Sequence, residues 1–158
     1  MRWTEAEAMN KLLDPISDRV DGPIKNRLGH NVPWAEMTPN EAKALMGMLP
    51  KSMGKSLTYL IACMKGNAQT LKHELCHAQY YVSQEWRELV NHVWSDVLSD
   101  RDRTYLTSFL TRLKYQPSVH IDEFQAYALT EPANFWGIQI DEALEALQPL
   151  RELLSSSK

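Results

Sequence analysis

The segment His73-Glu74-Leu75-Cys76-His77 contains the residues whose types and spacing could carry out chemistry. On an α-helix, residues four positions apart share a face, so both imidazoles can turn toward a single ion. Zinc binds neutral imidazole nitrogens well and lowers the pKa of a water that it binds. The glutamate lies one position after the first histidine and can reach that water without binding the ion, so it can act as a general base. The segment therefore predicts a Zn²⁺ site that activates water.

A third ligand should follow, because a catalytic zinc ion usually has three protein ligands and leaves one position for water. Glu123 is the first candidate, on a helix predicted downstream of the motif. Ile121, Phe124 and Ala128 would bury one side of that helix, and Glu123 stands among aromatic and small residues rather than in a run of charges. This setting favours a ligand over the two alternatives, a surface carboxylate or a buried ion-pair partner.

His92 is the second candidate for the third ligand, and it follows His77 by fifteen positions. On its predicted helix it shares a face with Glu85, Glu88 and Asp96, opposite the side that carries tryptophan and valine. A charged face of this kind is typical of a helix surface in contact with water. A surface histidine is therefore the favoured interpretation of His92.

Hydrolysis also needs a group that stabilises the negative charge developing on the carbonyl oxygen. Tyr127, His120, Tyr80 and Tyr81 are the candidates. Tyr127 stands one helical turn after Glu123, so its hydroxyl could point into the same cleft. We therefore take Tyr127 as the second candidate catalytic residue, with a packed core tyrosine as the alternative.

The motif His73–His77, followed downstream by Glu123-Phe124-Gln125-Ala126, resembles the HExxH…ExxA arrangement of the gluzincin zinc metallopeptidases. The chain has 158 residues, which is similar to the small single-domain members. The resemblance implies that His73, His77 and Glu123 bind zinc, that Glu74 is the general base, and that the substrate is a peptide or protein.

One feature of the larger gluzincins has no direct counterpart in this sequence. Those proteins often carry an aspartate shortly after the ligand glutamate, where it orients a ligand histidine. Here Tyr127 stands four residues after Glu123. The nearest acidic residue is Asp122, which is expected to lie off the face of the helix that carries the ligand.

Two alternative functions compete with a gluzincin-like peptidase. The motif, with Cys76 inside it and His92 downstream, also resembles the SprT-like proteases that act on DNA-associated proteins. In those proteins a glycine usually follows the third histidine, whereas Val93 follows here, and a net charge of −3 gives no reason to expect nucleic-acid binding. The second alternative is a zinc-binding interaction module without turnover, which would not need Glu74 as a base.

The elements that must position these residues are mostly helices. A capping box at Thr4–Glu7 and another at Thr38–Glu41 each predict a helix start, and Pro15 is expected to end the first helix. Residues 15–37 are rich in Pro, Gly, Asn and Asp and are expected to be irregular. Helices are predicted over about 4–14, 38–49, 68–82, 84–98, 100–116, 121–129 and 141–154.

The best strand candidate is Ser56–Met64, a short apolar run between Gly54 and Gly66 that comes directly before the motif helix. In zincins, such a strand lines the cleft and pairs with an extended substrate. We therefore expect a mainly α fold (α+β, zincin-like), with a short strand or small sheet before the motif helix. The length suits a single domain over residues 1–158.

Composition limits the surroundings in which the chain is expected to act. The polar start of the sequence does not resemble a secretory signal, and no apolar run reaches the length of a membrane span. The two cysteines, Cys63 and Cys76, do not form a disulfide framework. The expected location is the cytoplasm, without membrane or nucleic-acid partners and with an unspecified oligomeric state.

Overall fold

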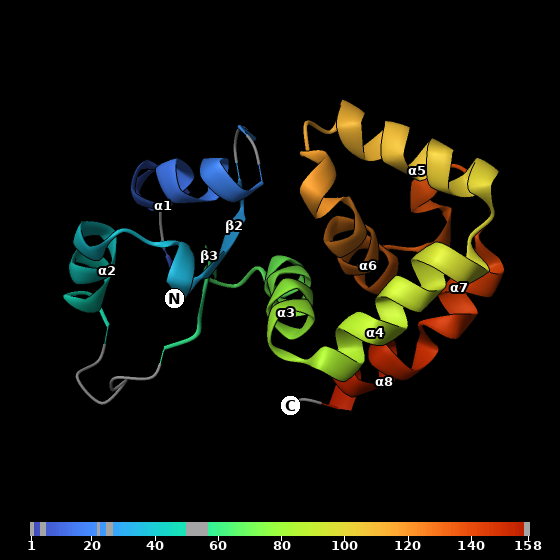
Figure 1. Ribbon diagram of the computed structural model, residues 1–158. Helices are drawn as coiled ribbons and strands as arrows, with labels where there is room; N and C mark the ends of the chain where they lie inside the picture. The colour runs from blue at the N-terminus through green and yellow to red at the C-terminus, as the bar shows by residue number, and fades with distance from the viewer. Residues whose placement is uncertain (1, 4–5, 22, 25–26, 50–56, 157–158) are drawn as a thin grey trace.

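A computed structural model of the chain describes residues 2–3, 6–21, 23–24, 27–49 and 57–156. The fold is mainly α-helical with one small sheet (Figure 1), as the sequence predicts. Within the described ranges, no helix is both long and apolar enough to cross a bilayer. The helices are α1 (Ala6–Val20), α2 (Pro39–Met46), α3 (Ala68–Val82), α4 (Gln84–His92), α5 (Asp100–Arg112), α6 (His120–Thr130), α7 (Asp141–Ala146) and α8 (Gln148–Ser156).

The sheet has the strand order β1-β3-β2, formed by β1 (Arg2–Trp3), β2 (Gly29–Pro33) and β3 (Tyr59–Met64). The central strand β3 pairs in parallel with β1 and antiparallel with β2, with Asn31 opposite Ile61. The predicted strand before the motif helix is therefore present, but it begins at Tyr59: residues 57–58 are not strand, and residue 56 lies outside the described residues. Because β3 is central, β2 lies at an edge of the sheet, where it is next to α3.

Helix α3 lies between an N-terminal half, made of α1, α2 and the sheet, and a C-terminal half made of α4–α8 (Figure 1). Each half has its own cluster of buried apolar side chains, and Cys76 of α3 belongs to the C-terminal cluster, as buried filler. The buried residues of α3 are Glu74, Cys76 and His77. The motif therefore faces the interior, where both halves of the molecule can contribute to its surroundings.

The N-terminal third departs from the sequence prediction in two places. Pro15 does not end the first helix, because α1 continues to Val20 and buries Ile16 in the N-terminal core. Burial of an apolar side chain there offsets the backbone bond that proline removes. Residues 29–33, expected to be irregular, form β2, since pairing with β3 outweighs the low strand preference of Gly and Asn. The capping box at Thr4 falls outside the described residues.

The other helices begin close to where the sequence predicts, but several end earlier or are divided. The capping box at Thr38 is present: Glu41 N donates to Thr38 Oγ1 (3.4 Å), and Thr38 N donates to Glu41 Oε2 (2.8 Å). α2 ends at Met46 rather than at 49. The predicted helix 84–98 is divided into α4 and a π-helical turn over 93–97, and the predicted helix 141–154 is divided into α7 and α8.

Candidate metal centre

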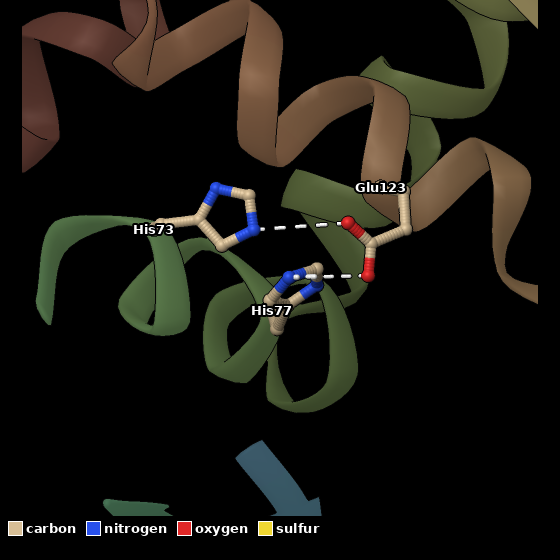
Figure 2. A group of neighbouring side chains, drawn as sticks. All are labelled: His73, His77 and Glu123. Atoms are coloured by element: carbon tan, nitrogen blue, oxygen red, sulfur yellow. Dashed lines mark ion pairs between the residues drawn. The ribbon is translucent and has the colours of Figure 1, made fainter. Parts of the chain in front are cut away.

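Two neighbouring helices bring three potential metal ligands together (Figure 2). His73 and His77 come from successive turns of α3, and Glu123 comes from the first turn of α6, which packs against α3. His73 Nε2 lies 3.7 Å from Glu123 Oε2, and His77 Nε2 lies 3.7 Å from Glu123 Oε1. One potential metal-ligating atom from each residue lies within 4.8 Å of the corresponding atoms of the other two. The structure therefore brings together the three ligands predicted from the sequence.

The Glu123 carboxylate is chemically compatible with a bound cation. Glu123 is buried, and its Oε2 is the one buried side-chain polar atom without a hydrogen-bond partner among the residues that the structure describes. A buried carboxylate oxygen without a partner is costly unless a cation or donor compensates it. Ligand atoms on a tetrahedral zinc ion are separated by about 3.3 Å, so the three ligating atoms, which lie within 4.8 Å of one another, would have to draw closer around an ion.

The electrostatics of the cluster also favour a positive charge between the carboxylates. Burial, followed by the neighbouring His77, lowers the pKa of His73 to about 4, so this imidazole is neutral, as a metal ligand must be. Burial alone lowers the pKa of His77, but Asp122 and Glu123 outweigh it and raise that pKa well above its ordinary value. Burial raises the pKa of Glu123 to about 7. Without a metal, the carboxylates therefore favour the protonated form of His77. A bound cation would take the place of that proton.

Asp122 contacts a ligand histidine, contrary to the expectation that it lies off the ligand face. Its Oδ1 is 2.9 Å from His77 Nδ1 and also accepts a hydrogen bond from Gln125 Nε2 (2.9 Å). The Trp86 indole donates to Gln125 Oε1 (3.1 Å). Because an indole N–H can only donate, it fixes the Gln125 amide so that the amide donates to Asp122. The Asp122 carboxylate then accepts the Nδ1 proton of His77, which leaves Nε2 free to bind a metal.

Removal of the Asp122 carboxylate should therefore weaken zinc binding. We expect Asp122→Ala to lower zinc affinity by about 10–100-fold, because His77 loses the group that fixes its ring and tautomer. Competition with a zinc chelator measures this change. Asp141→Ala is the matched control, since Asp141 also occupies the first turn of a helix, α7, but is exposed. Equal affinity in Asp122→Ala and the parent chain would show that Asp122 does not orient His77.

Glu74 lies beside the ligands and is held against the sheet. It is buried, and its Oε2 accepts a hydrogen bond from Asn31 Nδ2 of β2 (2.7 Å). Burial raises the pKa of Glu74, with His77 and His73 acting in the opposite direction. A Cβ atom on Gly29 would collide with Glu74 Oε1, so any larger residue where β2 passes the motif helix would have to displace the Glu74 carboxylate. A buried carboxylate in this setting is a reasonable base, because its affinity for a proton is increased.

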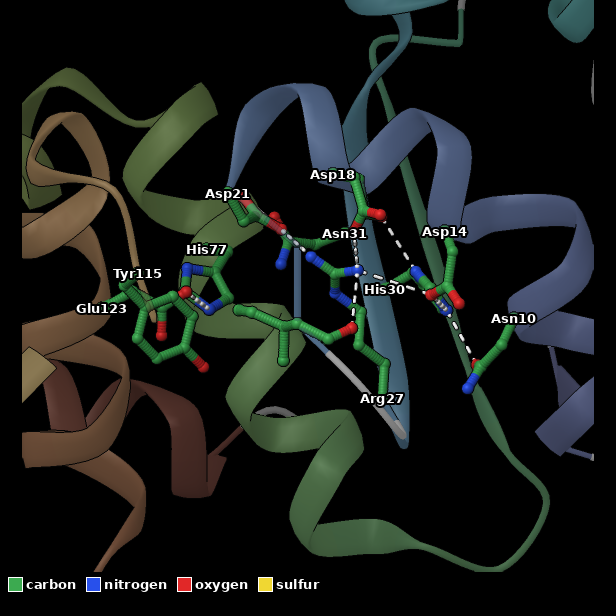
Figure 3. Close-up of polar contacts among 12 residues, drawn as sticks. Asn10, Asp14, Asp18, Asp21, Arg27, His30, Asn31, His77, Tyr115 and Glu123 are labelled. Carbon is green, nitrogen blue, oxygen red and sulfur yellow. Dashed lines mark hydrogen bonds and ion pairs between the residues drawn. The ribbon is translucent and has the colours of Figure 1, made fainter. Parts of the chain in front are cut away.

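The ligands and Glu74 open onto one cleft of about 300 Å³ between the two halves of the molecule. On the α1 side, the wall of the cleft contains Asp21 and the buried Arg27 (Figure 3). The Arg27 guanidinium lies 2.5 Å from Asp18, 3.4 Å from Asp14 and 3.8 Å from Asp21. Three carboxylates surround this single guanidinium, and burial raises the pKa of Asp21 to about 7, so the charge of Arg27 is compensated within the wall.

Tyr127 lines the cleft as predicted, and a second tyrosine that sequence reasoning missed lies beside it. The Tyr127 ring packs edge-on against His73 (4.7 Å between centroids) and stacks on Phe135 (4.8 Å). Its hydroxyl lies 2.9 Å from the hydroxyl of Tyr115, which also lines the cleft. Burial raises the pKa of both phenols, that of Tyr127 to about 12, so both stay protonated. One hydroxyl donates to the other, which leaves one phenolic proton of the pair for an oxyanion.

An unusual helix end directs Tyr115 into the cleft. Lys114 follows α5 with a φ of 76°, and the amides of Lys114 and Tyr115 donate back to Thr111 O (3.0 Å) and Leu110 O (3.2 Å). These two bonds form a Schellman motif, in which the left-handed position is usually glycine. Tyr115 could not be identified from the sequence because nothing there predicts this turn. A lysine occupies the left-handed position, where a glycine would have indicated the end of the helix.

Glycine at position 114 should therefore stabilise the protein. We expect Lys114→Gly to raise the free energy of unfolding by about 1 kcal/mol, because glycine adopts a positive φ without steric strain and Lys114 is exposed. For a chain of this size, that corresponds to an increase in Tm of about 2–4 °C in thermal melts. Lys114→Ala keeps the Cβ atom and should give no such gain. An equal gain in both variants would mean that the left-handed backbone is not the cause.

The remaining sequence candidates lie away from the cleft. His92 is exposed on α4, with Nδ1 2.8 Å from Asp96 Oδ2 and no contact with the ligand cluster. His120 is buried next to the Tyr115 carbonyl (3.2 Å), Tyr80 donates to Asn91 Oδ1 (3.0 Å), and Tyr81 contacts the ring of Tyr59. None of these four residues lines the cleft.

No family model matches the chain, and neither any curated protein nor any solved structure is detectably similar to it.

Proposed function

We propose that the chain is a zinc-dependent peptidase whose metal ligands are His73, His77 and Glu123. The observation that carries this proposal is the buried Glu123 carboxylate, whose Oε2 has no hydrogen-bond partner within the described residues. Its Oε2 lies 3.7 Å from His73 Nε2, and its Oε1 lies 3.7 Å from His77 Nε2. The presence of Glu74 in the same cleft supports a catalytic rather than a structural site. A structural zinc site usually has four protein ligands and needs no base.

Each of several residues around the cleft would carry out a different step of hydrolysis. A bound zinc ion would supply Lewis acidity toward water and the substrate carbonyl. Glu74 takes a proton from the attacking water as its oxygen bonds to the carbonyl carbon, and returns that proton to the leaving nitrogen as the C–N bond breaks. The hydroxyl pair of Tyr127 and Tyr115 has one proton that is not used in their mutual hydrogen bond, and the pair can donate it to the developing oxyanion. Asp122 keeps His77 in the tautomer that binds metal.

A peptide is the substrate class that the surroundings favour. Gly29, His30 and Asn31 of β2 line the cleft, and in the described part of the chain β2 pairs only with β3. An edge strand offers backbone groups to which an extended peptide can add as a further strand.

Metal analysis combined with a peptide assay tests the proposal. The purified chain should contain one zinc ion, cleave members of a mixed peptide pool, lose activity with a chelator and recover it when zinc is added back. Mass spectrometry of the pool would identify the cleaved bonds. A chain that binds no zinc would overturn the proposal, and a chain that binds zinc but cleaves none of the pool would act as a binding module.

A further inference from the structure

The Glu74 carboxylate is held by strand β2 rather than by the helix that carries it. Glu74 Oε2 accepts the hydrogen bond from Asn31 Nδ2 (2.7 Å), and Oε1 packs directly against Gly29. Asn31 in turn is held by β3, because the Tyr59 hydroxyl donates to Asn31 Oδ1 (2.5 Å). The strand register explains this contact: Asn31 is opposite Ile61, and Tyr59 lies two positions away on the same face of β3.

The direction of each hydrogen bond follows from the chemistry of the groups. An ionised carboxylate can only accept, so the Asn31 amide must present its NH₂ group to Glu74. Its oxygen then faces Tyr59, which must donate. The Tyr59 ring is itself held by contact with Tyr81 (5.3 Å between centroids). Tyr59, Asn31 and Glu74 therefore form a chain of hydrogen bonds in which each side chain fixes the orientation of the next.

We infer that Asn31, oriented by Tyr59, is a positioning residue that keeps the Glu74 carboxylate against β2 and out of the metal's coordination shell. The inference rests on the proposed function. A carboxylate next to His73 gains energy by binding a nearby divalent cation, and such a glutamate could no longer accept a proton from water. The bond from Asn31 offers Glu74 an alternative partner at a fixed distance from the ligands.

Three substitutions test this role. Asn31→Leu removes the donor at similar volume, and should lower kcat about 10–100-fold with KM within about twofold, because the base is misplaced while the cleft is kept. Zinc affinity should stay equal or rise, since Glu74 becomes free to approach the metal. Tyr59→Phe keeps the ring contact and should lower kcat by about 2–10-fold, the value of one neutral hydrogen bond. Asn31→Gln keeps the donor on a longer side chain and should recover part of kcat.

The chain offers matched controls away from the cleft. Tyr80 and Asn91 form the same kind of tyrosine–asparagine bond at 3.0 Å on the exposed side of α4, so Asn91→Leu should leave kcat and KM unchanged. Tyr105 donates to Trp136 O (3.0 Å), so Tyr105→Phe is the control for Tyr59→Phe. A fall in zinc affinity, or a rise in KM that accompanies the loss of kcat in Asn31→Leu, would reduce Asn31 to a structural role and overturn the inference.

A readout without turnover separates this inference from the proposed function. The NMR signals of the Asn31 side-chain NH₂ group should shift and exchange faster with water in Glu74→Ala and in Tyr59→Phe, but not in Tyr105→Phe. Unchanged signals would overturn the inference even in an active peptidase. Shifted signals in a chain that cleaves no peptide would support the contact while the proposed function fails. An active parent chain with unchanged kcat in Asn31→Leu would overturn the positioning role alone.

Discussion

Glu123→Gln should bind zinc at least about 100-fold more weakly than the parent chain. Four-ligand zinc sites contribute about 10–16 kcal/mol, which corresponds to about 3 kcal/mol, or roughly 100-fold, for each ligand. Glutamine fills the same space as glutamate but offers a neutral amide, so the loss reflects the ligand and not a cavity. Chelator competition and metal analysis after dialysis measure the change.

The same substitution should have the opposite effect, or none, on the protein without metal. Glu123 Oε2 has no hydrogen-bond partner among the described residues, so the buried carboxylate destabilises the metal-free fold. We expect thermal melts in chelator to give Glu123→Gln a Tm equal to or above that of the parent chain, whereas added zinc should raise only the parent's Tm strongly.

Two outcomes would contradict this assignment of the third ligand. One is full zinc affinity in Glu123→Gln and Glu123→Ala. The other is loss of zinc in His92→Ala, because His92 is exposed on α4 and paired with Asp96. The second outcome would favour the SprT-like arrangement, in which His92 binds the metal.

The ligand cluster could be predicted because its geometry is mostly local. His73 and His77 are one helical turn apart, so any regular helix over 68–82 aims them at one point. Glu123 could be proposed because its helix is amphipathic and places it near buried residues. The arrangement needs only that α3 and α6 pack together, which their apolar faces favour.

The role of Asp122 could not be predicted from the periodicity of its own helix. On that helix alone, adjacent residues point about 100° apart, so Asp122 and Glu123 do not share a face. His77 lies on a crossing helix and uses both ring nitrogens, one toward each carboxylate. Which two positions of α6 meet an imidazole of α3 depends on how the helices cross, and no sequence pattern specifies that.

Strand β2 was missed for a related reason. Its sequence, Gly-His-Asn-Val-Pro, has the composition of a loop, and its structure comes from pairing with β3 almost thirty residues later. Glycine and asparagine lower strand preference, yet here Gly29 makes room for Glu74 and Asn31 donates to it. The residues that made the strand hard to predict are those that contact the candidate base, as expected where function conflicts with local preference.

Glu74→Gln should keep zinc and lose peptidase turnover by about 10²–10⁴-fold, the range for removal of a general base. The substitution preserves size in a place where Gly29 leaves no space for a larger group. Its side-chain oxygen can still accept the bond from Asn31, so the structure around the ligands should be retained. Metal analysis together with kcat on a peptide identified by the pool assay measures both effects.

Glu131→Gln is the matched control, because Glu131 also lines the cleft but is held by Gln69 (3.4 Å) rather than by β2. Its zinc content and turnover should stay close to those of the parent chain. Retained turnover in Glu74→Gln would remove Glu74 as the base and leave the cleft without an identified proton acceptor. Loss of zinc in Glu74→Gln would instead make Glu74 part of the metal site, which the bond from Asn31 is inferred to prevent.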